Sequence, residues 1–298
     1  MTSPPGSADV TVIVVTYNSA HCIDGLAPTL AALPHVTIVD NASNDGTVEA
    51  VARAMPNALI LRNQENRGFG AANNLALRQV KTPYALLLNP DCLPTPDLLA
   101  RLLEVARAYP DAAMIAPHLI RRNGEVEVSY RWPGTHWRSR GPAAEGICCV
   151  GFVCGAVMLI NIAAMQEIGF FDEDFFLYYE DEDLCQRIFT RRKAIIVAPH
   201  VTVTHLSRGS VRGNSPLRAE FYRGYHHAQS KLIFTEKHLG AAHAARLRRK
   251  TLALAVAALL PRLLVPAPRY VARLLGRIRG LCAATIPYSA QANHTQTT

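Results

Sequence analysis

The chain has 298 residues, 49% hydrophobic and 18% charged, which is enough apolar sequence for a full buried core. Seven cysteines without a CxxC pair argue against a disulfide framework or a cysteine zinc site and favour a reducing compartment. The net charge of +8 is unevenly placed. Residues 1–236 carry 21 Lys and Arg against 23 acidic residues, whereas residues 237–298 carry ten Lys and Arg and no acid. This distribution argues against a nucleic-acid role for the protein as a whole and predicts a basic accessory segment.

The N-terminal part alternates β-rich runs with helical stretches. Residues 1–8 lack the basic and apolar regions of a signal peptide and are expected to form a flexible leader. Strands alternating with helices are typical of parallel βαβ units in an open, doubly wound α/β sheet. The predicted strands are residues 10–16, 35–40, 58–62 and 84–88.

Polar residues stand where these predicted strands end. Ligands bind such sheets at the carboxyl ends of their strands, so these positions are candidates for a binding site. They are Thr16, Tyr17, Asn18, Asp40, Asn41, Asn89 and Asp91.

The second half of the chain is less regular. Residues 155–160 predict an apolar strand, followed by a short helix, and residues 180–192 predict a helix with Leu184 and Ile188 on its buried side. The polar residues 289–298 are expected to be disordered.

Residues 121–146 are rich in Arg, Gly and Pro and predict a long loop or small insertion. Trp132 and Trp137 lie in this segment. Their rings would either stack on a bound ligand or form a small core beneath the insertion.

Residues 172–183 hold seven of the 23 acidic residues in twelve positions. Like charges this close raise one another's pKa, so the cluster predicts a bound cation, a positive partner or a carboxylate base. The aromatic block at residues 175–179 favours burial over a solvated acidic surface, as in the lining of a cleft.

Residues 40–47 lie at a predicted strand end and enter a helix. Their carboxylates and amides would hold a nucleotide base or ribose, as acidic residues after Rossmann-type strands do. The alternative is a helix cap made by Asn44 or Asp45.

Residues 66–74 resemble a dinucleotide fingerprint but lack its third glycine, which Asn73 replaces. One interpretation is a glycine turn into a helix whose N-terminal amides face an anion such as a diphosphate. The other is a turn with a helix cap and no ligand.

Residues 86–91 place Asn89 and Asp91 directly after an apolar strand. Mg²⁺ and Mn²⁺ use one or two protein carboxylates and take further oxygens from substrate phosphates, a role that Asp91 suits. The alternative is a capped turn before the next helix.

Taken in order, these motifs resemble those of the family 2 glycosyltransferases of GT-A fold. The particular resemblance is to bacterial rhamnosyltransferases and their galactofuranosyl-transferring relatives. It covers roughly residues 9–240 and implies a mostly parallel central sheet flanked by helices. The matching segments are residues 14–18, 39–47, 66–73, 89–91, 169–176 and 179–185.

The resemblance implies roles for single residues. Thr16 and Tyr17 would line the nucleotide pocket, and Asp40 would bond the base. Asp91 matches the last residue of the family's DxD motif and would bind Mg²⁺ or Mn²⁺ on the donor diphosphate. Asn89 departs from that motif at its first Asp position. The expected donor-binding residues are Thr16, Tyr17, Asn18, Asp40, Asn41, Ser43, Asn66, Gly68, Phe69, Gly70, Asn73, Asn89 and Asp91.

His205 follows a β-branched run, as a ligand at a strand end would. In relatives, a histidine at the matching position completes the metal or diphosphate site. A lone histidine is more often structural, and that alternative stays open.

Asp181 matches the family's catalytic base. In a single inverting displacement at the anomeric carbon, the acceptor hydroxyl loses its proton as it attacks, and a carboxylate within hydrogen-bond reach accepts it. Glu180 is the second catalytic candidate and would hold the acceptor. Asp183 stands one turn before Arg187, which predicts a structural ion pair between them.

The basic C-terminal segment predicts an amphipathic helix. In residues 268–281, Arg269, Arg273 and Arg277 share one face and the apolar residues share another, a pattern typical of helices at an anionic membrane surface. The alternative is a helix that packs on the catalytic domain or on a second subunit of a homo-oligomer. Residues 251–260 are apolar but too few to span a bilayer.

Together these features predict an inverting, metal-dependent glycosyltransferase on the cytoplasmic face of the membrane. The expected reaction moves L-rhamnose from dTDP-L-rhamnose to a lipid-linked or polysaccharide acceptor of the cell envelope. The alternatives are another sugar such as galactofuranose from UDP, a sugar nucleotidyltransferase, and a non-catalytic scaffold. The expected organisation is a leader at 1–8, a catalytic domain at 9–240, a membrane-associating helical tail at 241–288 and a disordered end at 289–298.

Overall fold

The computed structural model describes residues 6–131, 142–206, 215–263 and 267–283. The expectations for Trp132, Trp137 and the end at 289–298 therefore lie outside the described residues. The chain forms two compact units, each considered by itself below. The first comprises Met1–Arg67, Ala71–Phe171 and Leu184–Arg212, and the second comprises Gly68–Gly70, Asp172–Asp183 and Gly213–Thr298.

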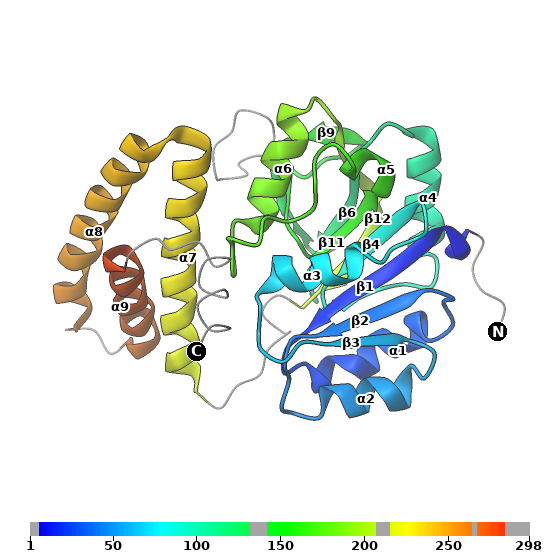
Figure 1. The fold of residues 1–298 in the computed structure, drawn as a ribbon, viewed down its shortest axis with the longest axis horizontal. Coiled ribbons are helices and arrows are strands. Elements are labelled where there is room, and N and C mark those ends of the chain that lie inside the picture. Colours follow the sequence, from blue (N-terminus) through cyan, green and yellow to red (C-terminus); the bar gives the residue numbers. More distant parts are fainter. Residues whose placement is uncertain (1–5, 132–141, 207–214, 264–266, 284–298) are drawn as a thin grey trace, which may run out of the picture. The chain divides into compact units, whose positions relative to one another are not determined.

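The first unit is an α/β domain built on one large sheet (Figure 1). The β-branched run at its N-terminus forms a strand that is buried over most of its length. Four strands pair in parallel, as predicted. Their order in the sheet is β3-β2-β1-β4. They are β1 (Val10–Thr16), β2 (Val36–Asp40), β3 (Leu59–Arg62) and β4 (Tyr84–Leu88).

The sheet continues as β4-β11-β6-β12-β5 and is mixed in direction. β11 runs antiparallel to both neighbours, and β12 runs parallel to β6 but antiparallel to β5 and β9. β7 pairs with β6, and β8 with β10 form a separate ribbon. These strands are β5 (Cys92–Leu93), β6 (Met114–Ile120), β7 (Val126–Glu127), β8 (Tyr130–Arg131), β9 (Cys148–Val150), β10 (Phe152–Val153), β11 (Val157–Asn161) and β12 (Ile195–His205).

Helices cover both faces of the sheet. Side chains of α1, α2 and α4 share one hydrophobic core with alternating strand residues such as Val10, Val12 and Val14. Figure 1 shows α1 and α2 on one side of strands β1–β3 and α3 on the other. The bounds are η1 (Ser7–Asp9), η2 (Ala20–Cys22), α1 (Ile23–Leu30), α2 (Thr47–Ala54), α3 (Phe69–Leu77), α4 (Leu98–Ala108) and α5 (Ile162–Met165).

Helix α6 (Glu180–Thr190) confirms the helix predicted after the acidic segment. Leu184 and Ile188, predicted on its buried side, are both fully buried.

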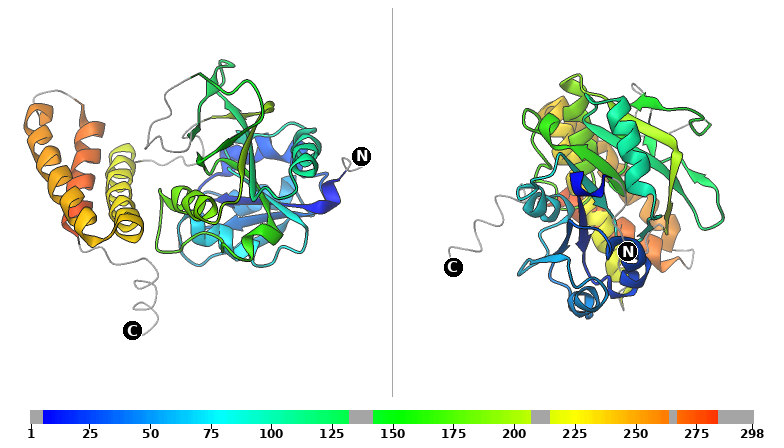
Figure 2. Two further views of the ribbon diagram at one scale, coloured as in Figure 1. Left: turned by 90° about the horizontal axis from the view of Figure 1, so that it is seen from above. Right: turned by 90° about the vertical axis from the view of Figure 1, so that its right-hand side faces the viewer.

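The second unit contains three long helices, which lie side by side in Figures 1 and 2. They are α7 (Pro216–Leu239), α8 (Ala241–Leu263) and α9 (Pro268–Cys282). None of the described helices is both long and apolar enough to cross a bilayer, in agreement with the expectation for residues 251–260.

Glycines set the distance between α7 and α9. A Cβ atom at Gly224 would lie 2.0 Å from the Arg273 carbonyl oxygen, and one at Gly276 would lie 1.9 Å from that of Phe221. A Cβ atom at Gly280 would lie 2.6 Å from the Tyr225 carbonyl oxygen. The two helices therefore touch through their backbones, which only residues without a side chain permit.

Part of the apolar side of α9 is buried within this unit. Leu281 packs with Ala228 and Leu232 of α7 in a small core that Leu247 and Leu252 of α8 extend. This packing was the alternative to a helix that turns its whole apolar side to a membrane.

Candidate active site

The carboxyl ends of β1 and β2 bring Thr16 and Asp40 together. The two residues are paired in the parallel register, and the Thr16 hydroxyl donates a hydrogen bond of 3.2 Å to Asp40 Oδ1. The backbone N–H of Ser43 donates to Asp40 Oδ2 at 3.0 Å. Asp40 is only 1% exposed, so its carboxylate is held rigidly at the sheet edge.

The loops after these two strands are joined by hydrogen bonds. The Asn18 N–H donates to Ser43 Oγ at 2.9 Å, and the Asn44 N–H donates to Asn18 Oδ1 at 2.9 Å. Asn18 and Ala42 have φ values of 52° and 65°, in the left-handed region that side chains rarely adopt. Such backbone strain clusters at functional sites, and here it lies beside Tyr17, which is 36% exposed.

Asp45 binds the first N–H of the next helix, although the N-cap residue itself is Gly46 and not Asn44 or Asp45 as one interpretation of residues 40–47 predicted. Its carboxylate accepts the Thr47 N–H at the start of α2 and the Ala20 N–H at 3.0 Å. Burial would raise the pKa of Asp45, but these bonds and the one from the Thr47 hydroxyl outweigh it and lower that pKa. Asp45 is therefore structural.

Asn41 and Asn66 are brought together as part of an amide network. The Asn41 side-chain amide donates to Asn66 Oδ1 at 2.8 Å. Asn41 Oδ1 accepts from the Asn63 side chain and from the Arg67 N–H, both at 3.0 Å. Asn63 was not predicted, because an isolated asparagine in a loop carries no local signal.

Gly68 is required by a close backbone approach within the second unit. It has a φ of 84°, and a Cβ atom there would lie 2.1 Å from the Phe176 carbonyl oxygen. That oxygen accepts the Phe69 N–H at 3.1 Å, so one of the first amides of α3 is already occupied. This contact supports the turn-and-cap interpretation of the segment, in which Gly70 simply continues the helix.

Asn73 and Asn74 are both buried in α3. Asn74 exchanges two hydrogen bonds with the backbone of Phe171, at 2.9 and 3.0 Å, and so fixes the loop that precedes the acidic segment. Asn73 was among the predicted donor-binding residues, whereas the structural role of Asn74 was not predicted.

Asp91 and His205 meet because β5 pairs with β12. His205 is opposite Cys92 in that register, and the Leu206 N–H donates to the Asp91 carbonyl at 2.9 Å. His205 Nε2 lies 3.7 Å from Asp91 Oδ1. Asn89 stands in the turn between β4 and β5, where its N–H donates to the Ala156 carbonyl.

Asp91, Cys92 and His205 place their potential ligand atoms within 4.8 Å of one another. Burial and the neighbouring Asp91 raise the pKa of the Cys92 thiol well above its usual value, so it stays protonated and is a poor ligand. A carboxylate oxygen and an imidazole nitrogen remain, with the phosphates of a substrate to complete the shell. This donor set fits a divalent ion such as Mn²⁺.

Glu127 supports His205 and was not predicted. Its Oε2 lies 3.3 Å from His205 Nδ1, while Nε2 is the nitrogen on the Asp91 side. A carboxylate on the far nitrogen fixes the orientation of a metal-binding imidazole. Only the pairing of β7 with β6 brings Glu127 here, and that pairing has no sequence signal.

Asp183, predicted to pair with Arg187 one turn later, has two partners on α7 that the sequence did not indicate. Asp183 is fully buried, and its Oδ1 lies 2.7 Å from Lys237 Nζ and 2.8 Å from His238 Nε2 of α7. Lys237 also binds Asp172. Burial lowers the pKa of Lys237, but its bonds to the two carboxylates outweigh that effect and raise it.

Arg187 binds backbone carbonyl groups. Its guanidinium donates to the carbonyls of Ile168, Gly169 and Phe170. These three bonds tie the loop before the acidic segment to α6.

The aromatic block of the acidic segment is buried at Phe175 and Tyr179 and half-buried between them, so it is not a solvated surface. Phe175 and Tyr179 pack against Phe234 of α7, and Phe176 stacks on His226 with ring centroids 4.4 Å apart. These rings form a core within the second unit.

Glu180 and Asp181 begin α6 after two strained residues. Tyr178 and Tyr179 have φ values of 70° and 69°. Glu180 is buried, and its Oε2 has no hydrogen-bond partner among the described residues. Burial and the adjacent Asp181 raise the pKa of Glu180 well above its usual value. Asp181 is half-buried and accepts the Glu182 N–H at 2.9 Å.

A family model described as Glycosyl transferase family 2 matches residues 11–169, more than half of the chain. The chain belongs to this family. It is a glycosyltransferase, as the sequence predicted.

Curated relatives agree with this assignment. The chain is 25% identical over 266 residues to the N-acetylglucosaminyl-diphospho-decaprenol L-rhamnosyltransferase of Mycobacterium tuberculosis, covering 77% of this chain and 85% of the relative. It is 26% identical over 190 residues to the low-salt glycan biosynthesis hexosyltransferase Agl10 of Haloferax volcanii, covering 60% and 61% of the two chains.

Solved structures show that the fold is GT-A. The mannosyltransferase PcManGT of Pyrobaculum calidifontis, in complex with GDP-Man and Mn²⁺, has a TM-score of 0.56 at 19% identity and covers 92% of this chain and 87% of its own. GalNAc-T7 with UDP, GalNAc and Mn²⁺ has a TM-score of 0.53 at 14% identity, covering 75% and 51%.

Proposed function

We propose that this glycosyltransferase moves L-rhamnose from dTDP-L-rhamnose to a lipid-linked acceptor, with inversion at the anomeric carbon. The observation that carries the proposal is the alignment with a rhamnosyltransferase that spans 85% of that enzyme's length. The name of that relative describes a diphospho-prenol acceptor. The principal alternative is another sugar, such as galactofuranose from UDP.

The donor nucleotide would bind at the ends of β1 and β2. Asp40 would accept a hydrogen bond from the base, with Thr16, Tyr17 and Asn18 beside it. Support comes from the buried Asp40 carboxylate, which accepts two hydrogen bonds, and from the strained, hydrogen-bonded loops around it. The remaining expected donor-binding residues belong to the same proposal: Asn41, Ser43, Asn66, Gly68, Phe69, Gly70, Asn73 and Asn89.

A divalent ion would be held by Asp91 and His205 and would offset the charge that develops on the leaving diphosphate. Mn²⁺ is a better match than Mg²⁺ because Mg²⁺ prefers an all-oxygen shell, whereas this site offers an imidazole nitrogen. Two structural neighbours contain Mn²⁺.

Asp181 would take the proton from the acceptor hydroxyl. It is half-buried at the start of α6, while Glu180 is buried and has a raised pKa. An accessible carboxylate is the better base, and a protonated Glu180 would donate a hydrogen bond to the acceptor.

The helical tail would place the enzyme at the inner face of the cell membrane, as a peripheral protein engaged in envelope glycan synthesis. The basic residues of α8 and α9 and the exposed apolar side chains Leu254 and Val256 of α8 support this. The domain boundaries expected from the sequence, and a homo-oligomer formed through the tail, belong to the same proposal.

A donor panel tests the reaction. The full chain is incubated with Mn²⁺, a prenyl-diphosphate-linked N-acetylglucosamine and, in parallel, dTDP-L-rhamnose, UDP-galactofuranose, GDP-mannose or UDP-N-acetylglucosamine. We expect transfer of rhamnose alone, with inverted configuration by NMR. Transfer of galactofuranose instead would establish the alternative, and equal transfer from all four donors would contradict both.

A further inference from the structure

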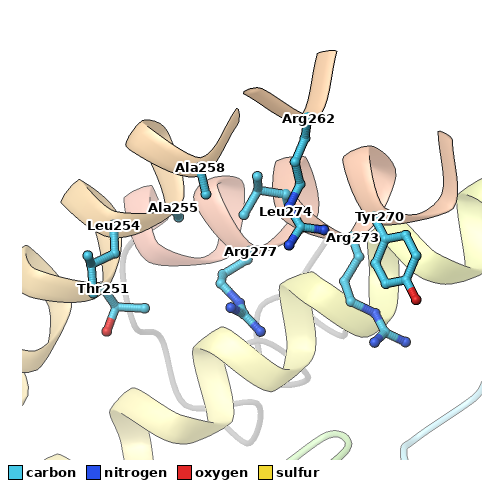
Figure 3. Close-up of a pocket in the computed structure, with 9 residues that line it drawn as sticks. All are labelled: Thr251, Leu254, Ala255, Ala258, Arg262, Tyr270, Arg273, Leu274 and Arg277. Atoms are coloured by element: carbon cyan, nitrogen blue, oxygen red, sulfur yellow. The ribbon is translucent and has the colours of Figure 1, made fainter. Parts of the chain in front are cut away.

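A pocket of about 350 Å³ lies between α8 and α9, within the second unit (Figure 3). Three arginines and one tyrosine line it together with apolar side chains of both helices. The lining residues are Thr251, Leu254, Ala255, Ala258, Arg262, Tyr270, Arg273, Leu274 and Arg277.

The arginines of this pocket are not equally neutralised. Arg273 Nη2 lies 2.6 Å from Glu220 Oε2, and Glu220 also binds Arg223 at 2.8 Å. Among the described residues, no carboxylate lies within ion-pair distance of Arg262 or Arg277. The pocket therefore contains two positive charges that the described part of the chain does not neutralise.

The surroundings of Arg277 add further positive charge. Burial, followed by the charge of Arg277, lowers the pKa of Lys231, and the same two causes with Lys231 and Arg273 lower the pKa of His227 to about 4. The charges of Lys231 and Arg277 repel each other, so an anion in the pocket would relieve an unfavourable interaction.

Other contacts fix the geometry of the cationic side. The Arg262 guanidinium lies 5.4 Å from the centroid of the Tyr270 ring, a cation–π contact that limits its rotation. Glu220 similarly fixes Arg273. Both guanidinium groups are thus oriented before any ligand arrives.

The other side of the pocket is apolar and continues onto the surface. Leu254, Ala255, Ala258 and Leu274 line it, and Figure 3 shows the first three along α8. Leu254 is 62% exposed. An occupant with a compact anionic head and an apolar chain would satisfy both sides.

We propose that this pocket binds the diphosphate of a prenyl diphosphate lipid. Arg262 and Arg277 would hold phosphate oxygens, since guanidinium groups bind phosphate in a fixed bidentate geometry. The first isoprene units would lie against Leu254 and Leu274. Two unneutralised charges match a diphosphate better than the single charge of a phospholipid phosphodiester. The inference rests on the proposed lipid-linked acceptor and gives its diphosphate a binding site in the chain.

Calorimetric titration of the full chain, without donor or metal, tests the pocket. Geranylgeranyl diphosphate is the probe, and inorganic diphosphate and geranylgeraniol represent its two halves. We expect the probe to bind at least about tenfold more tightly than either half, because only the probe satisfies both sides. Equal affinity for inorganic diphosphate would contradict a lipid ligand.

Matched variants locate the binding. Arg262→Gln and Arg277→Gln should each weaken binding of the probe about tenfold, the effect of losing a charge-assisted hydrogen bond. Arg269→Gln, on the same helix as Arg277 but outside the pocket, should leave the affinity for the probe unchanged. Leu254→Gln should weaken binding of the probe but not binding of inorganic diphosphate. The control is Val256→Gln, at an exposed position of the same helix. Unchanged affinity in Arg277→Gln would overturn the proposal.

Vesicle binding distinguishes a specific site in the pocket from a general attraction of the basic helices to anionic membranes. Binding to phosphatidylglycerol vesicles without preference for the prenyl diphosphate would overturn the proposal. Because the titration contains no donor, its outcome is independent of transfer. A chain that binds the probe but transfers no sugar would overturn the proposed function alone. A chain that transfers rhamnose to the prenyl-linked acceptor but does not bind the probe would overturn this inference alone.

Discussion

His205 presents its two ring nitrogens to two different carboxylates: Nε2 lies 3.7 Å from Asp91 Oδ1, and Nδ1 lies 3.3 Å from Glu127 Oε2. One nitrogen is thus oriented by Glu127 while the other faces the candidate metal ligand. Strand pairing between β5, β12, β6 and β7 produces this arrangement from three distant segments. In this arrangement Asp91 and His205 are the candidate metal ligands, and Glu127 orients the His205 ring.

Replacing these three residues should weaken the response to Mn²⁺ in a defined order. Glu127→Gln should raise the Mn²⁺ concentration needed for half-maximal transfer by about 10- to 100-fold, as for other residues that orient a metal ligand. His205→Ala and Asp91→Asn remove proposed ligands and should raise it at least as much. Transfer rates over a MnCl₂ titration measure this. Exposed Glu125→Gln is the control, and a wild-type titration curve for His205→Ala would contradict the metal assignment.

Asp181→Asn should lower kcat by about 10²- to 10⁴-fold, the usual contribution of a general base. The KM for the donor should change little, because Asp181 is proposed to act on the acceptor. Steady-state kinetics with the prenyl-linked acceptor measure both quantities. Neighbouring Glu182→Gln controls for changes at the start of α6, and full activity of Asp181→Asn would exclude it as the base.

Glu180→Gln should stabilise the protein at neutral pH. The raised pKa of Glu180 means that the folded state favours the protonated acid. The penalty for ionising this buried group is absent below its ordinary pKa of 4.5 and grows as the pH rises toward the folded-state pKa. Melting temperatures of both proteins from pH 4.5 to 8 should therefore diverge with rising pH. A Gln variant that melts lower than wild type at pH 8 would show that the ionised carboxylate has a stabilising partner.

Asp183→Asn should destabilise the protein strongly, because it leaves Lys237 and His238 without their buried partner. Loss of one member of a buried pair typically costs about 3–5 kcal/mol, and the partial exposure of Lys237 places the expected value at or below the lower end. Urea unfolding measures it. The matched control is Asp97→Asn, whose exposed pair with Arg101 should contribute less than about 1 kcal/mol. Equal effects of the two variants would contradict a structural role for Asp183.

The sequence predicted those parts of the fold that local pattern determines. The β-branched run of β1 and the apolar run of β4 are buried strands, and Leu184 and Ile188 face the core. Asp91 was predicted at a strand end because a polar residue after an apolar strand is a local signal.

The features that the sequence did not reveal depend on distant pairing. Nothing local indicates that β11 runs antiparallel to its neighbours or that Glu127 reaches His205. Helical spacing favoured an ion pair between Asp183 and Arg187. It did not indicate the lysine and the histidine of α7 that bind Asp183, because tertiary packing supplies these partners.

The backbone contact between α7 and α9 has a consequence for sequence variation. Even alanine at Gly224 or Gly276 would collide with a carbonyl oxygen of the facing helix. Family members that possess this three-helix unit should therefore have glycine at the positions of Gly224, Gly276 and Gly280 even where the surrounding residues differ. In members with larger residues there, α9 must separate from α7, and the arginines at the positions of Arg262 and Arg277 should then vary freely. These glycines would thus identify, from sequence alone, which relatives share the pocket.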